Sequence, residues 1–238
     1  VFGTPMASRL SAIGSQAQQH RGEEGAGIVS ADQEGVFHSH KDMGLVAHVF
    51  SNGALDKLVG EIATGHNRYS TTGGSGIHNV QPLDSEYKLG RIAIGHNGNL
   101  VNTNSLRTIL LDQGAFFRTT ADTEIMLHLL ARSKGTLTDA IKNMMKQVSG
   151  AYSLVIMTKD ELVGVRDPKG MRPLCLGKIG NAYVLASETC ALDLMGAEFI
   201  RDVEPGEIVI ISRDGIRSEK HPCSTCKAFC IFESVYFM

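Results

Sequence analysis

The segments "EIATGHNRYS" (residues 61–70) and "RIAIGHNGNL" (residues 91–100) both contain the pattern Ile-Ala-x-Gly-His-Asn. Each begins with apolar residues typical of a buried strand, and a Gly then lets the backbone turn before polar side chains follow. We therefore expect two strands that end in loops presenting Arg68 and Asn97. If both ends open on the same edge of one sheet, the two side chains will reach one pocket, and His66 and His96 will be hydrogen-bonded structural residues.

The segments on either side predict the general architecture. Residues 7–20 are typical of a helix, and residues 25–41 of a hairpin. Helices are expected over residues 103–113, 120–133 and 136–148, and short β runs return after residue 150. Strands, then helices, then strands favour an α+β layered domain over alternating βαβ units.

Length and charge limit the class of protein. A chain of 238 residues can hold one sizeable domain. Lys and Arg total 23 against 25 Asp and Glu, so no basic face for nucleic acid or an anionic membrane is indicated. The longest apolar runs fall well short of the roughly 20 residues that a membrane helix needs. Five Cys form no regular disulfide pattern and suit a reducing compartment.

Three sites carry residues that suit the recognition of an amino acid. Asn97 and Gly98 are typical of a tight turn, but between a strand and a helix they could also present two hydrogen-bond donors to an oxyanion. Arg68 is either an ordinary surface cation or a fork for a carboxylate. Asp122 either caps a helix or accepts an ammonium group. An oxyanion site, a carboxylate fork and an ammonium acceptor together suit an amino acid with a side-chain amide, which is glutamine or asparagine.

These and other motifs resemble a known family. The segments "QHRGEEGAGI", "GHNRYSTTG", "GHNGNLVN" and "TTADTE" are similar to class II glutamine amidotransferases, which are N-terminal-nucleophile hydrolases. The later segments "RDPKGMRPLCLG", "EPGEIVIIS" and "AFCIFESVYF" resemble the glutamine phosphoribosylpyrophosphate amidotransferase branch, which begins purine synthesis. The resemblance covers nearly the whole chain in the expected order. It implies the four-layer αββα sandwich of this family.

The resemblance also implies roles at the two ends of glutamine. Arg68 would bind its α-carboxylate and Asp122 its α-ammonium group. Asn97 and Gly98 would form the oxyanion hole for the side-chain amide.

Further roles concern the loop after Arg68 and the start of the chain. The resemblance implies that Thr71 contacts glutamine from a closing loop and that Arg21 supports the site from the end of the first helix. The family's nucleophile is an N-terminal Cys, whose α-amine serves as the base. We expect it to precede Val1, because none of the five Cys lies at the start of the sequence.

The resemblance divides the chain into residues 1–220, the glutaminase domain, and residues 221–238, the start of a connection to a phosphoribosyltransferase domain. Phosphoribosylpyrophosphate and Mg²⁺ would bind that further domain. Cys230 matches a ligand of the [4Fe-4S] cluster in cluster-bearing members, although a Cys between apolar residues is also typical of a core. Cys223 and Cys226 are expected in an exposed tail.

Two alternatives remain open from the sequence. The chain could be the glutaminase domain of another class II amidotransferase, or a glutamine-binding or regulatory module without a nucleophile. The resemblance further implies a homo-oligomer in the cytoplasm or the plastid stroma.

Overall fold

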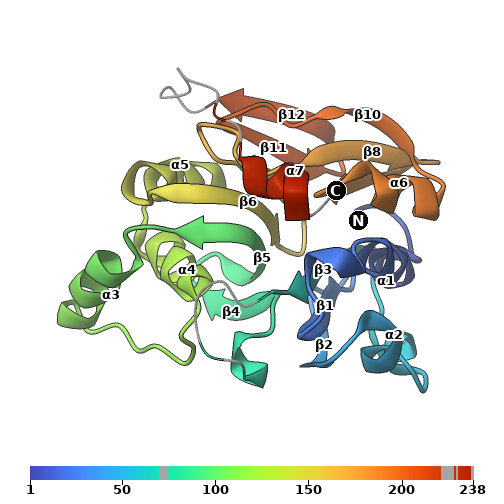
Figure 1. Ribbon diagram of the computed structural model, residues 1–238, viewed down its shortest axis with the longest axis horizontal. Coiled ribbons are helices and arrows are strands. Elements are labelled where there is room, and N and C mark those ends of the chain that lie inside the picture. The colour runs from blue at the N-terminus through green and yellow to red at the C-terminus, as the bar shows by residue number, and fades with distance from the viewer. Residues whose placement is uncertain (70–73, 75, 221–227, 229, 237–238) are drawn as a thin grey trace.

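The computed structural model describes residues 1–69, 74, 76–220, 228 and 230–236 (Figure 1). Its helices are α1 (Ala7–Ala17), α2 (Val46–Val49), α3 (Thr103–Asp112), α4 (Asp122–Arg132), α5 (Leu137–Gln147), α6 (Thr189–Met195) and α7 (Ile231–Tyr236), with short 3-10 turns η1 (Gln19–Arg21), η2 (Ala54–Lys57) and η3 (Ile77–Asn79). Its strands are β1 (Gly25–Ala31), β2 (Phe37–Met43), β3 (Ile62–Arg68), β4 (Leu83–Tyr87), β5 (Gly90–Leu100), β6 (Gly150–Met157), β7 (Glu161–Arg166), β8 (Cys175–Ile179), β9 (Ala182–Ala186), β10 (Glu198–Asp202), β11 (Glu207–Ser212) and β12 (Gly215–Lys220).

The strands form two sheets with antiparallel neighbours. One sheet has the order β12-β11-β7-β6-β5-β4. The other consists of β2-β1-β3 and β10-β8-β9, and Phe2 joins these halves by bridging Ile62 of β3 and Tyr183 of β9. The backbone N–H and C=O groups of Phe2 both bond to Tyr183, at 2.9 Å. The first residues of the chain therefore lie inside a sheet.

The two sheets pack against each other and carry helices on their outer faces. Val29, Ile62, Met157 and Val209 belong to the apolar layer between the sheets. Because neighbouring side chains of a strand point to opposite faces, Ile28 packs instead in the cluster that includes residues of α1 and α6. Figure 1 shows α1 and α6 on one side of the molecule and α3, α4 and α5 on the other. The four-layer αββα architecture is confirmed.

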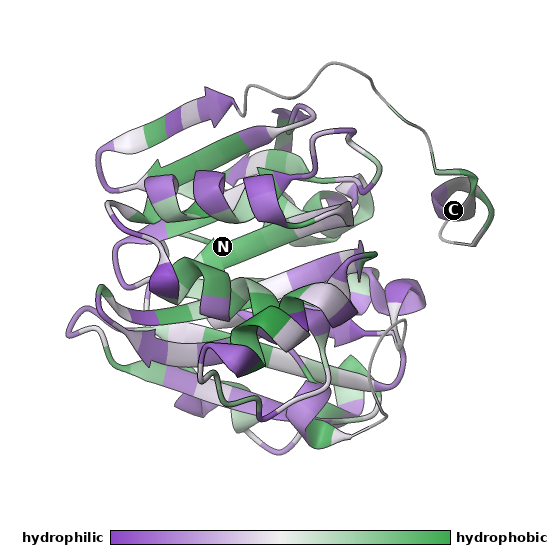
Figure 2. Cartoon of the chain, turned by 90° about the vertical axis from the view of Figure 1, so that its left-hand side faces the viewer, coloured by the Kyte–Doolittle hydropathy of each residue, from purple (hydrophilic) through white to green (hydrophobic). Residues whose placement is uncertain are grey.

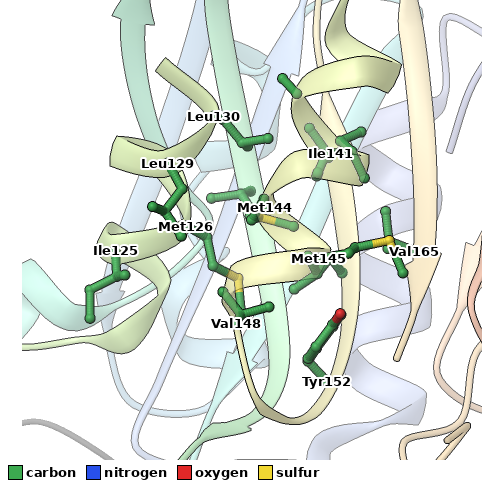
Figure 3. Close-up of a cluster of buried hydrophobic side chains, with 14 of the residues drawn as sticks. Ile125, Met126, Leu129, Leu130, Ile141, Met144, Met145, Val148, Tyr152 and Val165 are labelled. Atoms are coloured by element: carbon green, nitrogen blue, oxygen red, sulfur yellow. The ribbon is translucent and has the colours of Figure 1, made fainter. Parts of the chain in front are cut away.

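The largest apolar cluster lies between α4, α5 and the six-stranded sheet (Figure 3). Helical spacing places Ile125 and Leu129 of α4 on one buried face, while Met144 of α5 is fully buried with them. A capping box between Thr136 and Asp139 begins α5. This packing fixes the start of α4, where Asp122 lies.

The distribution of apolar and polar residues along the strands agrees with this layering. In Figure 2 the strands in the interior are mostly apolar, whereas β12, the edge strand before the grey segment, is largely hydrophilic. Within the described residues, no helix is long and apolar enough to cross a membrane.

Two details of the expected arrangement are wrong. The Gly-His-Asn segments lie inside β3 and β5 rather than in loops after them, because Gly95 to Leu100 continue to pair with β6. The two strands also belong to different sheets, since β3 pairs with β1. Asn97 and Gly98 therefore do not form a turn between a strand and a helix.

Candidate functional site

A cavity of about 110 Å³ is lined by residues of β3, β5, η1 and the start of α4. One water needs about 10–15 Å³, so the cavity has room for a small ligand. Five predicted site residues line it together: Arg21, Arg68, Asn97, Gly98 and Asp122. Thr71 lies outside the described residues.

The two Gly-His-Asn segments meet across the sheets at this cavity. The ring Nε2 of His66 lies 2.9 Å from the backbone carbonyl of His96. Since a carbonyl can only accept, Nε2 carries a proton. Burial lowers the pKa of His66 to about 4, which favours the neutral ring at neutral pH. The interpretation of His66 as a hydrogen-bonded residue agrees with this contact.

Arg68 ends β3 with its side chain buried. Its guanidinium donates to the carbonyl of Asn79 at 2.6 Å and to that of Gly74 at 2.8 Å. Its Nε lies 3.4 Å from a carboxylate oxygen of Glu24. These contacts hold the planar guanidinium in one orientation at the cavity wall. A bidentate contact with a carboxylate requires such a fixed orientation.

Asp122 lies at the first position of α4, and its carboxylate contacts two residues of β5. One carboxylate oxygen accepts the backbone N–H of Leu100 at 3.0 Å, and the other lies 3.2 Å from Nδ1 of His96. Burial would raise the pKa of Asp122, but His96 and the N–H groups of Leu100 and Thr123 lower it overall. Asp122 is therefore an oriented anion at the cavity.

Asn97 and Gly98 occupy neighbouring positions of β5, opposite Ser153 and Tyr152 of β6. Gly98 has a φ of +143°, and a Cβ built there would lie 2.0 Å from the carbonyl oxygen of Ala151. Only Gly fits this backbone. Within the described part of the chain, the buried Nδ2 of Asn97 has no hydrogen-bond partner. A buried donor of this kind calls for an acceptor, which a ligand carbonyl would provide.

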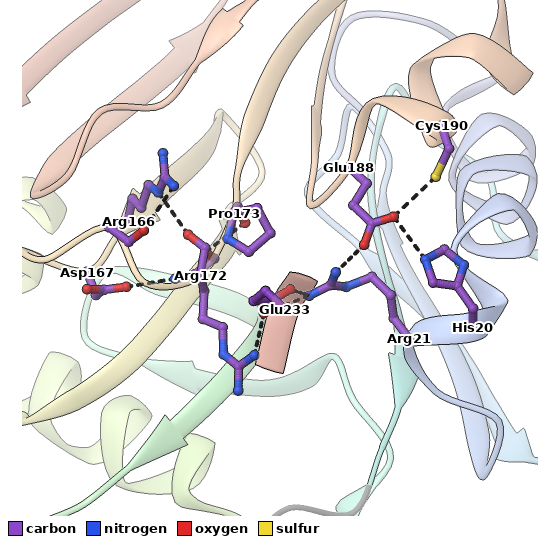
Figure 4. Close-up of polar contacts among 11 residues, drawn as sticks. His20, Arg21, Arg166, Asp167, Arg172, Pro173, Glu188, Cys190 and Glu233 are labelled. Carbon is purple, nitrogen blue, oxygen red and sulfur yellow. Dashed lines mark hydrogen bonds and ion pairs between the residues drawn. The ribbon is translucent and has the colours of Figure 1, made fainter. Parts of the chain in front are cut away.

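Arg21 is held by two acidic residues that the sequence analysis did not single out. Its guanidinium donates to Glu188 and, at 3.0 Å, to Glu233 of α7 (Figure 4). Glu188 also contacts His20 at 2.9 Å. These carboxylates occupy the donors of Arg21 and suit a supporting role rather than direct capture of a ligand.

Arg172 is a further cavity residue that the sequence analysis missed. Asp167, which is fully buried, accepts the backbone N–H groups of Met171 at 2.9 Å and Arg172 at 3.2 Å. Nε of Arg166 also donates to the carbonyl of Arg172 at 2.8 Å. The "RDPKGMRP" segment thus folds around its own Asp. The only sequence signal for Arg172 was its place in this quoted motif.

Cys230 lies just before α7 and does not line the cavity. It is a half-buried free thiol. Among the described residues, no three His, Cys, Asp or Glu side chains are grouped as a metal would require. A [4Fe-4S] cluster needs four ligands, and the described residues alone do not fit one. Cys223 and Cys226 lie outside the described residues.

Comparison with known proteins identifies the class of domain. The family model described as "Glutamine amidotransferase domain" matches residues 66–194, which include Arg68, Asn97, Gly98 and Asp122. The chain belongs to this family.

Similar whole proteins come from bacteria and plants. The chain is 46% identical over 239 residues to amidophosphoribosyltransferase of Bacillus subtilis (strain 168), covering 100% of this chain and 50% of that protein. It is 47% identical over 239 residues to chloroplastic amidophosphoribosyltransferase 1 of Arabidopsis thaliana, covering 100% and 42%. A solved structure of glutamine phosphoribosylpyrophosphate amidotransferase from B. subtilis, complexed with ADP and GMP, has a TM-score of 0.93 and 44% identity, covering 99% and 51%. The chain thus spans about half the length of these relatives.

Proposed function

We propose that this chain is the glutamine-hydrolysing domain of an amidophosphoribosyltransferase. It releases ammonia from glutamine, and a further domain transfers the ammonia to phosphoribosylpyrophosphate to give phosphoribosylamine, the first step of purine synthesis. Support comes from the family match and from identity to amidophosphoribosyltransferases along the whole chain.

The observation that carries the proposal is the buried Nδ2 of Asn97, which has no hydrogen-bond partner among the described residues and lies in a cavity shared with Arg68 and Asp122. Arg68 binds the α-carboxylate of glutamine and Asp122 its α-ammonium group, so the backbone end of the ligand is fixed at two points. The side-chain carbonyl then accepts from Asn97 and Gly98, which stabilise negative charge on that oxygen in the transition state. Arg21 supports the wall, and Thr71 contacts glutamine from the loop after Arg68.

The nucleophile is an N-terminal Cys that precedes Val1, as the family resemblance implies. Val1 is buried and lines a second small cavity, which shares Ser15, Gln18 and Gly65 with the main one. A Cys-Gly pair ahead of Val1 would therefore begin beside the glutamine site. Its α-amine has a pKa of about 8 and accepts the proton of the thiol, whose pKa is about 8.5. The thiolate adds to the amide carbon, ammonia leaves with that proton, and water hydrolyses the thioester to glutamate.

The test compares two forms of the chain, one with Cys-Gly and one with Ser-Gly before Val1. We expect both forms to bind glutamine in calorimetry and only the Cys-Gly form to release glutamate. Binding by both forms without turnover in either would support the alternative, a glutamine-binding module. Absence of glutamine binding in both forms would overturn the proposal.

The remaining features of the proposal belong to the whole protein. Phosphoribosylpyrophosphate and Mg²⁺ bind the further domain, and the protein is a homo-oligomer in the cytoplasm or plastid stroma, in keeping with bacterial and chloroplastic relatives. Cys230 supplies at most one cluster ligand, with the others outside the described residues. Iron and sulfide analysis of the full-length protein, with Cys230→Ser as the variant, tests the cluster. Light scattering tests the oligomer.

A further inference from the structure

One acidic side chain from a distant part of the chain contacts two arginines of the cavity wall. Glu233 of α7 lies 212 positions from Arg21 and 61 from Arg172. Its carboxylate accepts from Nη2 of Arg21 at 3.0 and 3.2 Å and also accepts from Nη1 of Arg172. Both arginines line the cavity, so one carboxylate joins α7 to two residues of its wall (Figure 4).

The side chains of Arg21, Arg172 and Glu233 are largely buried, so each charge needs the opposite charge beside it. The exposed fractions of their side chains are 7% for Arg21, 11% for Arg172 and 13% for Glu233. Arg21 also pairs with Glu188, whereas Glu233 is the one carboxylate that the described residues place against Arg172. Removing one partner of a buried pair leaves an uncompensated charge, which is costly. Without Glu233, Arg172 would have to turn toward water and the cavity wall would change.

Two apolar side chains of α7 contribute little packing. Ile231 and Val235 are 73% and 66% exposed. Just before the helix, the backbone N–H of Ala228 donates to the carbonyl of Lys169 at 2.9 Å. Among the described side chains of α7, Glu233 makes the ion pairs that join the helix to the body of the domain.

We propose that Glu233 is a positioning residue that docks α7 on the cavity and thereby sets its affinity for glutamine. Docking holds Arg21 and Arg172 in the cavity wall, where the carboxylate of Glu233 compensates their charge. Arg68 then recognises the carboxylate of the ligand. Because coupling between two binding events is reciprocal, glutamine also strengthens the docking of α7. The choice of glutamine as ligand rests on the proposed function.

The first test measures glutamine binding by the Ser-Gly form, which does not turn over. We expect Glu233→Gln to weaken binding about tenfold, within the usual range of coupling between sites. Ile231→Gln, on the same helix, should leave the affinity within about twofold. Arg172→Met added to Glu233→Gln should weaken binding less than the two single effects combined, because both act through one contact. Unchanged affinity in Glu233→Gln, or full additivity in the double variant, would overturn the proposal.

A second pair of readouts separates positioning from general loss of structure. In the Cys-Gly form, Glu233→Gln should raise KM for glutamine with kcat within about twofold, as expected for an interaction made equally in ground and transition states. Methyl NMR of Val235 reports docking without ligand, and its signals should narrow in Glu233→Gln. Broad, unshifted Val235 signals in that variant would overturn docking by Glu233. If the Ser-Gly form without further substitutions binds no glutamine, the proposed function fails. The NMR comparison still tests whether Glu233 docks α7, because it needs no ligand.

Discussion

Gly98 offers the sharpest test of the backbone at the proposed oxyanion site. Its φ of +143° is a conformation that costs a non-Gly residue about 1–3 kcal/mol. In addition, the Cβ of an Ala would lie 2.0 Å from the carbonyl oxygen of Ala151 on β6, so the paired strand must shift. Such overpacking costs about a further 1–3 kcal/mol. We therefore expect Gly98→Ala to destabilise the domain by about 2–6 kcal/mol.

Gly90 is the matched control, because it lies in the same strand with a φ of +104° and nothing within 4 Å of a built Cβ. Gly90→Ala should carry the backbone cost alone. For a chain of this size, 1 kcal/mol shifts the melting temperature by about 2–4 °C, so Gly98→Ala should melt roughly 2–12 °C below Gly90→Ala. Differential scanning calorimetry measures both. Equal melting temperatures would refute the claim that Gly98 is needed for close approach of β5 and β6.

Other predictions concern the rest of the site. Burial lowers the pKa of His66 from 6.5 to about 4, so between these pH values the unfolded chain binds a proton that the native chain does not. The free energy of unfolding, measured by urea titration, should therefore fall by about 3 kcal/mol between pH 7 and pH 4. The fall should be smaller in His66→Gln. In the Cys-Gly form, Asn97→Ala should lower kcat about 100- to 1000-fold, and a raised KM with normal kcat would contradict an oxyanion role. Asn67→Ala should instead lower stability by about 1–3 kcal/mol with kcat retained, because its amide bonds to carbonyls of Ser15 and Gln18. Arg68→Lys should raise KM about tenfold, since an ammonium lacks the fork for a carboxylate, and an unchanged KM would contradict that contact.

The layered fold was open to prediction because local patterns determine most of it. The helices expected over residues 103–113, 120–133 and 136–148 correspond closely to α3, α4 and α5. Which strands pair is a long-range property, and the repeated pattern gave no sign that β3 and β5 enter different sheets. Asn-Gly is common in tight turns, yet here both residues pair with β6 within a strand.

The candidate site shows the same division between local and distant information. Arg68, Asn97 and Asp122 stand within recognisable motifs next to predicted strands and helices, so their side chains could be selected from the sequence. Arg172 and Glu233 are single charged residues whose importance lies in their contact with each other across 61 positions. No periodicity or spacing reports such a contact, and the structure was needed to find it.

The repeated Ile-Ala-x-Gly-His-Asn segment has a physical explanation once the two sheets are seen to face each other. The His of β3 donates across the sheets to the backbone of the His of β5, and the latter contacts Asp122. Both Asn side chains line the cavity, but the Nδ2 of the Asn of β3 donates to two carbonyls at the end of α1, whereas that of the Asn of β5 has no partner among the described residues. One copy therefore anchors the sheet to its covering helix, and the other leaves a buried amide donor directed at the cavity. Equal sequence patterns take different roles because their strands lie on opposite sides of one cavity.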